Sequence, residues 1–211
     1  MKIDIAIIKQ LQVQIQHDNQ VAFEDLYRRF FPRLFNFCML YVHKKETAEE
    51  IVNDVMVKIW NKREGICGIE NLETYLFVSV RNLSLNYLQK HSHLYLVVAP
   101  ESGVVEITDF SNPAKALEWK EISFRLSMAI EQLPDQQRTV FKLIKEEGFK
   151  YREVAEILGV SVRTVETQLY RTIKKLAAIT NTFIDSPLPA KKSNNNTGLL
   201  ILLLLGCFFV R

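Results

Sequence analysis

The residues best suited to chemistry lie in one stretch, residues 151–171, where two short helical patterns meet at a glycine. Gly159 can adopt the positive φ that ends a helix, and Ser161 can cap the helix that follows. Ala155 is small enough to let the two helices cross closely. This spacing is typical of a helix-turn-helix, whose second helix enters the major groove of DNA.

The second of these helices carries polar side chains on one face. With Val165 and Leu169 facing inward, the helical period turns the polar residues outward. Arginine suits guanine edges and phosphates, glutamate suits cytosine, and threonine suits the thymine methyl group. The alternative is an ordinary helical hairpin with a capped turn. The candidate DNA contacts are Arg163, Thr164, Glu166, Thr167, Tyr170, Arg171 and Lys174.

The sequence has few residues arranged for nucleotide binding, metal binding or catalysis. The 7 glycines of this 211-residue chain form neither a phosphate-binding loop nor a dinucleotide-binding fingerprint. The histidines form no H-E-x-x-H pattern, and Cys38, Cys67 and Cys207 are too far apart for a C-x-x-C pair. We therefore expect no enzyme, no cofactor and no metal site. Three cysteines and a start without an export signal favour a reduced, cytoplasmic location.

The distribution of charge points weakly in the same direction as the motif. The chain carries a formal net charge of +3, and residues 149–178 hold six basic and three acidic groups. A small basic helical unit is typical of nucleic-acid binding, although a solvated helix face explains the same charges.

The apolar periodicity predicts an all-α fold. Amphipathic helices are expected at 21–42, about 46–62 and about 72–90, and the three can share one core. Pro32 should kink or divide the first helix, and Thr47 is a candidate cap for the second. The third should bury Leu76, Val80, Leu83 and Leu88.

The helical pattern fails between residues 93 and 113, where prolines, Gly103 and a net acidic composition indicate a flexible linker. Helical spacing then returns at Ala114. We therefore expect two small helical domains, in the order N-terminal helix (1–19), first domain (20–93), linker (94–113), second domain (114–180) and disordered tail (181–211).

The tail ends in an uncharged apolar segment, residues 198–210. A membrane span needs about 20 residues, so these thirteen are too few to cross a bilayer comfortably. Three interpretations remain open: docking on this protein or a partner, shallow membrane contact helped by Lys191 and Lys192, and an accident of the gene's end.

Several segments resemble one family, the sigma-70 sigma factors of bacterial RNA polymerase, and within it the short extracytoplasmic-function (ECF) group. Residues 132–143, followed by the helix-turn-helix, are similar to region 4 of that family. Residues 23–34, 48–60 and 72–88 resemble successive parts of region 2. The resemblance covers residues 20–178, so the first domain would be region 2 and the second region 4.

The resemblance implies a set of contacts. Region 4 would read the −35 promoter element and dock on the flap of the polymerase β subunit, while region 2 would grip the β′ coiled coil and melt the −10 element. The polymerase-binding residues would be Glu49, Glu50, Asn53, Asp54 and Lys58. The −10 contacts would be Asn61, Lys62, Arg63, Arg81, Asn82, Asn86, Tyr87 and Lys90.

The family resemblance implies a cytoplasmic, nucleoid-associated initiation factor whose partners are core RNA polymerase, promoter DNA and an anti-sigma factor. The acidic linker would thread the RNA-exit path or have no special role. One alternative is a stand-alone helix-turn-helix regulator that binds an operator. Another is a membrane-tethered adaptor whose working part is the tail.

Overall fold

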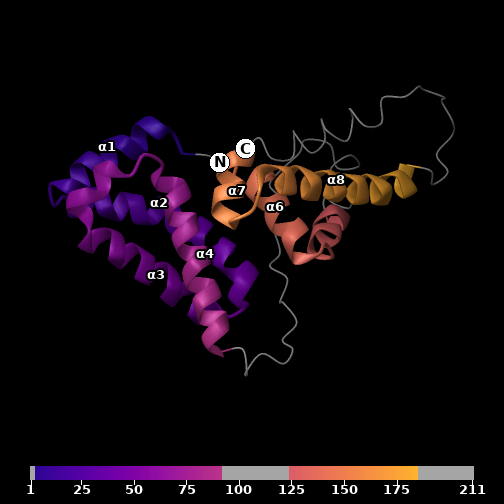
Figure 1. Ribbon diagram of the computed structural model, residues 1–211, viewed down its shortest axis with the longest axis horizontal. Coiled ribbons are helices and arrows are strands. Elements are labelled where there is room, and N and C mark those ends of the chain that lie inside the picture. The colour runs from indigo at the N-terminus through magenta and orange to yellow at the C-terminus, as the bar shows by residue number, and fades with distance from the viewer. Residues whose placement is uncertain (1–2, 92–123, 185–211) are drawn as a thin grey trace, which may run out of the picture. The chain divides into compact units, whose positions relative to one another are not determined.

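The computed structural model describes residues 3–91 and 124–184, with side chains described as far as residue 178 (Figure 1). These residues divide into two compact units. The N-terminal unit contains residues 3–91 and 147–162, and the C-terminal unit contains residues 124–146 and 163–184. The linker and the apolar terminal segment of the sequence analysis lie outside the described residues.

The N-terminal unit is built from five α-helices and one short 3-10 helix. They are α1 (Ile5–Gln16), α2 (Gln20–Val42), α3 (Lys45–Asn61), η1 (Arg63–Gly68), α4 (Leu72–His91) and α7 (Tyr151–Leu158). Helices α2, α3 and α4 pack against one another around a core whose largest side chains are fully buried. The core includes Phe30, Leu34, Val52, Met56, Leu76 and Phe77. The predicted three-helix core is therefore confirmed.

The start of each of the first two helices is determined by a local polar contact. The Asp4 carboxylate accepts a hydrogen bond from the Ala6 amide at 2.9 Å, and the Asn19 side chain accepts one from the Ala22 amide at 3.1 Å. Such caps satisfy amides that have no partner inside the helix. They place α1 and α2 as separate helices with their apolar faces in a common interior.

Two local expectations need correction. Of the kink or division expected at Pro32, division is wrong, because α2 continues for 23 residues with Phe30 and Leu34 fully buried on either side of the proline. Burial of these neighbours offsets the loss of one backbone hydrogen bond. Thr47 does not cap α3, because the helix begins two residues earlier, after Lys44, and Thr47 is buried within its first turn.

Helix α4 also differs in part from its predicted burial pattern. Leu76 and Val80 are fully buried, as predicted, but Leu83 and Leu88 are only partly buried. Ser84 takes the interior position instead, where its hydroxyl donates to the Val80 carbonyl at 2.8 Å. A serine paired with the preceding turn can occupy a helix interior without leaving its hydroxyl unsatisfied.

The C-terminal unit is also helical. Residues 124–131 form a helix, and α6 (Asp135–Lys145) and α8 (Val162–Ile184) follow. Pro134 stands directly before α6, and the buried residues include Leu133, Phe141 and Leu143. The described portion of the chain contains helices and no strand, which confirms the all-α fold class. Within it, no helix is both long and apolar enough to span a membrane.

Candidate nucleic-acid and polymerase interface

The outward face of α8 carries all seven predicted −35 residues. Val165 and Leu169 are buried, whereas Tyr170 has 69% of its surface exposed. The helical register inferred from the sequence is therefore confirmed, and the side chains of this face are exposed to solvent. The exposed set is Arg163, Thr164, Glu166, Thr167, Tyr170, Arg171 and Lys174.

The turn before α8 has the conformation that the glycine predicts. Gly159 has φ of 61° and ends α7, and the Val160 amide donates to the Ala155 carbonyl at 3.0 Å. At the other end of α7, the Glu153 carboxylate accepts from the Lys150 amide at 2.7 Å. A short helix held at both ends in this way presents a defined start for α8.

The predicted polymerase face of α3 is exposed along its length. Tyr27 of α2 donates a hydrogen bond to the Asn53 side chain at 2.9 Å and so ties one member of this face to the next helix. Burial, together with the charge of Glu49, raises the pKa of Tyr27, so its hydroxyl remains a donor. The exposed residues of the face are Glu49, Glu50, Asn53, Asp54 and Lys58.

The predicted −10 residues fall into two groups. The first, Asn61, Lys62 and Arg63, lies at the end of α3 and the start of η1. Asn61 and Lys62 are exposed, but Arg63 is held by the protein itself. Its guanidinium lies 4.8 Å from the centre of the Trp60 ring, donates to the Trp60 carbonyl at 3.0 Å and pairs with Asp18.

The second group lies on α4. Asn82, Asn86 and Lys90 are exposed, whereas Arg81 and Tyr87 are partly buried. The Tyr87 ring is stacked on His91, with ring centres 4.2 Å apart. Burial raises the pKa of Tyr41 to about 12, although the hydrogen bond and positive charge of Arg81 oppose this effect. Arg81 is therefore supported by a neutral hydroxyl at its side.

The segment from the last residue of α3 to the approach of α4, residues 61–70, is exposed for most of its length. A side chain added at Gly65 or Gly68 would meet nothing within 4 Å, and the Cys67 thiol is exposed. Ile66 is the exception, with only 1% of its surface accessible. We call residues 61–70 the α3–α4 loop.

Sequence reasoning missed a polar residue that contacts this loop. Gln12 of α1 is fully buried, and its amide nitrogen donates to the carbonyls of Ile66 at 2.7 Å and Ile69 at 3.0 Å. It lies on the apolar face of α1 with Ile8, Leu11 and Ile15. A glutamine in such a row is the signal that could have identified it, because a buried amide needs partners.

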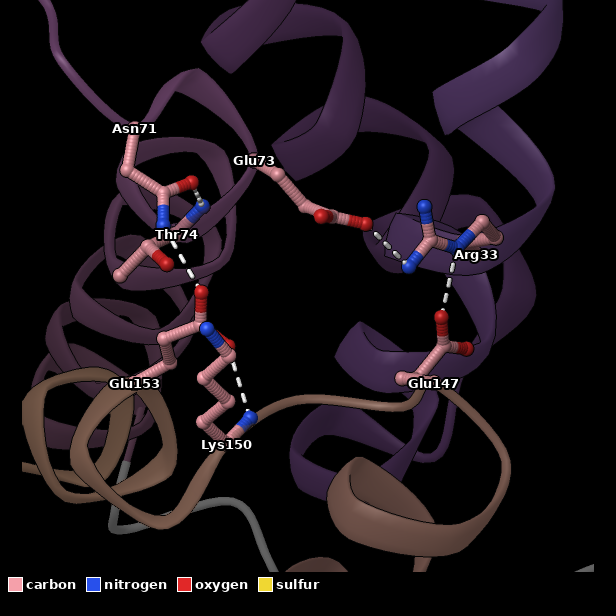
Figure 2. A network of polar contacts seen from close by, with 7 residues as sticks. All are labelled: Arg33, Asn71, Glu73, Thr74, Glu147, Lys150 and Glu153. Carbon is pink, nitrogen blue, oxygen red and sulfur yellow. Dashed lines mark hydrogen bonds and ion pairs between the residues drawn. The ribbon is translucent and has the colours of Figure 1, made fainter. Parts of the chain in front are cut away.

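A second missed residue, Arg33 of α2, joins two carboxylates (Figure 2). Its Nη2 atom lies 2.6 Å from Glu73 Oε1, and its Nε atom donates to Glu147 Oε2 at 2.5 Å. The approach to Glu73 is an ion pair without hydrogen-bond alignment. The exposed fractions of the three side chains are 13%, 4% and 17%, so the cluster is largely shielded from water.

The same region holds the segment 147–162 against α4. Asn71 donates to the Glu153 carboxylate at 3.0 Å and also caps α4 by accepting from the Thr74 amide, as Figure 2 shows. The rings of Phe77 and Phe149 meet edge to face, with centres 4.8 Å apart. Residues 147–162 are thus held by an ion pair to Arg33 of α2, a hydrogen bond from Asn71 to a carboxylate, and aromatic packing on Phe77 of α4.

Comparison with known families matches two parts of the chain. A family model described as sigma-70 region 2 matches residues 26–93, and one described as sigma-70, region 4 matches residues 123–176. Together they cover more than half of the chain. No described group of three His, Cys, Asp or Glu side chains is arranged to hold a metal ion.

Individual proteins agree with the family models. RNA polymerase sigma factor YlaC of Bacillus subtilis is 27% identical over 151 residues, which is 71% of this chain and 87% of YlaC. The ECF RNA polymerase sigma factor SigW of the same organism is 24% identical over 172 residues, covering 78% of this chain and 92% of SigW.

A solved structure shares the fold. The sigma factor RpoE from Bartonella quintana, crystallised with the anti-sigma factor NepR, superposes with a TM-score of 0.56 at 22% identity. The match covers 78% of this chain and 98% of that one. At this identity the likeness concerns the fold alone.

Proposed function

The chain belongs to the ECF group of the sigma-70 family and acts in promoter-directed transcription initiation, and from this premise we propose how its residues divide the work. Region 2, residues 20–93, binds core polymerase and opens the −10 element. Region 4, residues 114–180, anchors the −35 element. The observation that carries this proposal is the presence of both region matches, in order, on one chain whose predicted contact faces are exposed.

The exposed face of α8 is the proposed −35 reader. Arg163 and Arg171 suit guanine edges or phosphates, and Glu166 suits the amino group of cytosine. Because Glu166 carries a negative charge, it disfavours phosphate contact and favours a base with a free donor. This face therefore contributes sequence selection as well as attraction to the duplex.

The two −10 groups suit a strand that has lost its partner. Separated bases need amide donors, an aromatic face and positive charge along the backbone. Asn82 and Asn86 supply amides, Lys62 and Lys90 supply charge, and Tyr87 supplies a ring. Arg81 and Arg63 are held by protein contacts and would act from fixed positions.

The acidic face of α3 is the proposed site for the β′ coiled coil. Glu49, Glu50 and Asp54 stand exposed on one helix, with Lys58 after them. A negative surface favours a basic partner, and complementary charge speeds encounter. Region 4 would dock on the β flap, which would hold both DNA-reading surfaces on one enzyme.

Other assignments follow from the family rather than from a contact in this chain. The partner of a related sigma factor is an anti-sigma factor, and we propose one here. The proposed location is the cytoplasm, beside polymerase and the nucleoid, with contact between residues 198–210 and a membrane as an additional option. Nucleotide addition belongs to the polymerase, so the chain itself performs no catalysis.

The test is transcription by sigma-free core polymerase on fragmented host DNA, with and without the full chain, followed by mapping of the 5′ ends. New starts that share spaced −10 and −35 elements are expected. Without new starts, and with the polymerase active on its housekeeping factor, an operator-binding regulator becomes the better interpretation.

Two variants assign the faces in the same experiment. Arg171→Ala should weaken use of the −35 element by about 1–3 kcal/mol if this side chain reads a base. Asp54→Ala should reduce retention on core polymerase while far-ultraviolet circular dichroism stays unchanged. Unchanged retention would remove this face from the polymerase contact.

A further inference from the structure

The α3–α4 loop has few side chains of its own to fix its shape. Gly65 and Gly68 have open space around them, Ile66 is the only buried side chain among residues 61–70, and Arg63 anchors only the start of the loop, on Trp60 and Asp18. Glycine also permits backbone conformations that other residues do not. The conformation of this loop must therefore depend strongly on contacts to its backbone.

Those contacts come from α1, more than fifty residues earlier in the chain. Gln12 donates to the carbonyls of Ile66 and Ile69, and the Lys9 ammonium group donates to the Ile69 carbonyl at 3.1 Å. The Ile69 amide in turn donates to the Ile66 carbonyl at 3.1 Å. The two acceptors on which Gln12 acts are thus the ends of the last turn of η1.

The chemistry of position 12 is specific. A primary amide has two N–H donors, so one uncharged group can serve two carbonyls. The Gln12 oxygen is buried without a hydrogen-bond partner, so part of the cost of burying this side chain is uncompensated. A leucine or methionine would fill the same space without that cost, but would remove the one group that links the two carbonyls, leaving Ile66 with the Ile69 amide alone and Ile69 with the exposed Lys9 ammonium group alone.

We propose that Gln12 is a positioning residue for −10 recognition: from the interior of α1 it sets the backbone of the α3–α4 loop that reads the −10 element. Gln12 does not itself meet DNA. Its position lies before the segment that matches the region 2 family model, which begins at residue 26. This inference rests on the proposed −10 role of residues 61–63.

The test measures selectivity for −10 bases by letting all promoter variants compete in one reaction. Differences in the amount of active protein then do not affect the relative use of the promoters. Full-length protein and core polymerase transcribe a promoter library with a fixed −35 element and randomised −10 bases, and the enrichment of each base in the transcripts is counted. Gln12→Met should reduce selectivity at the −10 positions by roughly fivefold, the effect expected for one lost buried hydrogen bond. A library randomised at −35 should give the wild-type profile.

Two further variants serve as a control and as a weaker version of the same change. Gln10→Met makes the same substitution at an exposed position of α1 and should leave both profiles unchanged. Lys9→Met removes the single exposed contact to Ile69 and should shift the −10 profile in the same direction by less. Amide hydrogen exchange in residues 63–69 should accelerate in Gln12→Met, while exchange in the α2 and α3 core stays as in the wild type.

The outcomes distinguish failure of the proposed role of Gln12 from failure of the −10 role of the loop and from failure of the proposed function. If Gln12→Met lowers output equally on all promoters and leaves the −10 profile intact, its role is only structural and the inference is overturned. If Asn61→Ala, which removes an exposed amide from the loop, also leaves the −10 profile unchanged while wild type still initiates, the loop does not read −10 and the inference fails with that assignment. Failure of wild type to initiate would reject the proposed function itself.

Discussion

The contact of α1 with the α3–α4 loop and the contact of residues 147–162 with α4 use opposite chemistry. The first is made mainly by a fully buried, neutral amide on backbone carbonyls. The second places a guanidinium between two carboxylates, Glu73 and Glu147. Opening the first contact leaves no charge unpaired, whereas opening the second leaves shielded carboxylates without their shared cation. The first contact therefore fixes the shape of a backbone segment, and the second depends on the balance of charge among three side chains.

The largest effect should come from the centre of the charged contact. Arg33→Met leaves two shielded carboxylates without their shared cation, and breaking such a pair from one side is strongly destabilising. We expect the free energy of unfolding to fall by about 3 kcal/mol in urea titrations. Arg28→Met on the same helix, where the pair with Glu24 is mostly exposed, should change it by less than about 0.5 kcal/mol. Similar losses in the two variants would contradict the importance of burial.

A smaller effect is expected when only the far carboxylate is neutralised. Glu147→Gln retains the Arg33–Glu73 pair and weakens the attachment of residues 147–162 to Arg33 of α2 by about 1–2 kcal/mol. Hydrogen exchange in α7 should accelerate, while exchange in α2 and α3 should not change. Glu156→Gln, on the exposed side of α7, is the matched control. If the two variants exchange alike, the ion pair does not hold α7.

The smallest effect should appear in the C-terminal unit, where the charged contacts are more exposed. Although partial burial raises the pKa of Glu131, hydrogen bonds and charge from Lys142 and Arg138 lower it further, so the net pKa lies below the ordinary value of 4.5. Its stabilisation is therefore present above pH 4.5 and is lost as pH falls through the lower pKa of the folded state. Glu131→Gln should remove this pH dependence and cost about 0.5 kcal/mol near neutral pH. Unfolding curves between pH 3 and 7 would measure it, and an unchanged pH dependence in Glu131→Gln would contradict the assignment.

Local features of the sequence predicted the fold well. The period of Val165 and Leu169 correctly oriented α8, and Gly159 correctly marked the end of α7. Thr47 shows the limit of local reasoning, because its residue type suits a cap but its place in the three-helix core makes it a buried side chain. Tertiary burial decided between the two roles.

The contacts that sequence reasoning missed join distant parts of the chain. Arg33 and Glu147 are separated by 114 positions, and Gln12 and Ile66 by 54. No periodic pattern encodes a pairing over such distances, and the acceptors of Gln12 are backbone atoms that every residue type carries. Only the polar residue on an apolar face could have suggested that α1 has a further task. The −10, −35 and polymerase residues stay predictions that the transcription experiment will test.

The exposed thiol of Cys67 provides an attachment site for a fluorescent label within the α3–α4 loop. Burial raises the pKa of the Cys38 thiol to about 11, so this thiol is poorly reactive near neutral pH, while Cys67 is open to reagents. After Cys207→Ser, an environment-sensitive fluorophore attached at Cys67 would report from within the loop. Its emission could then be followed in stopped-flow mixing with promoter DNA, and would time the movement of the loop against the opening of the duplex.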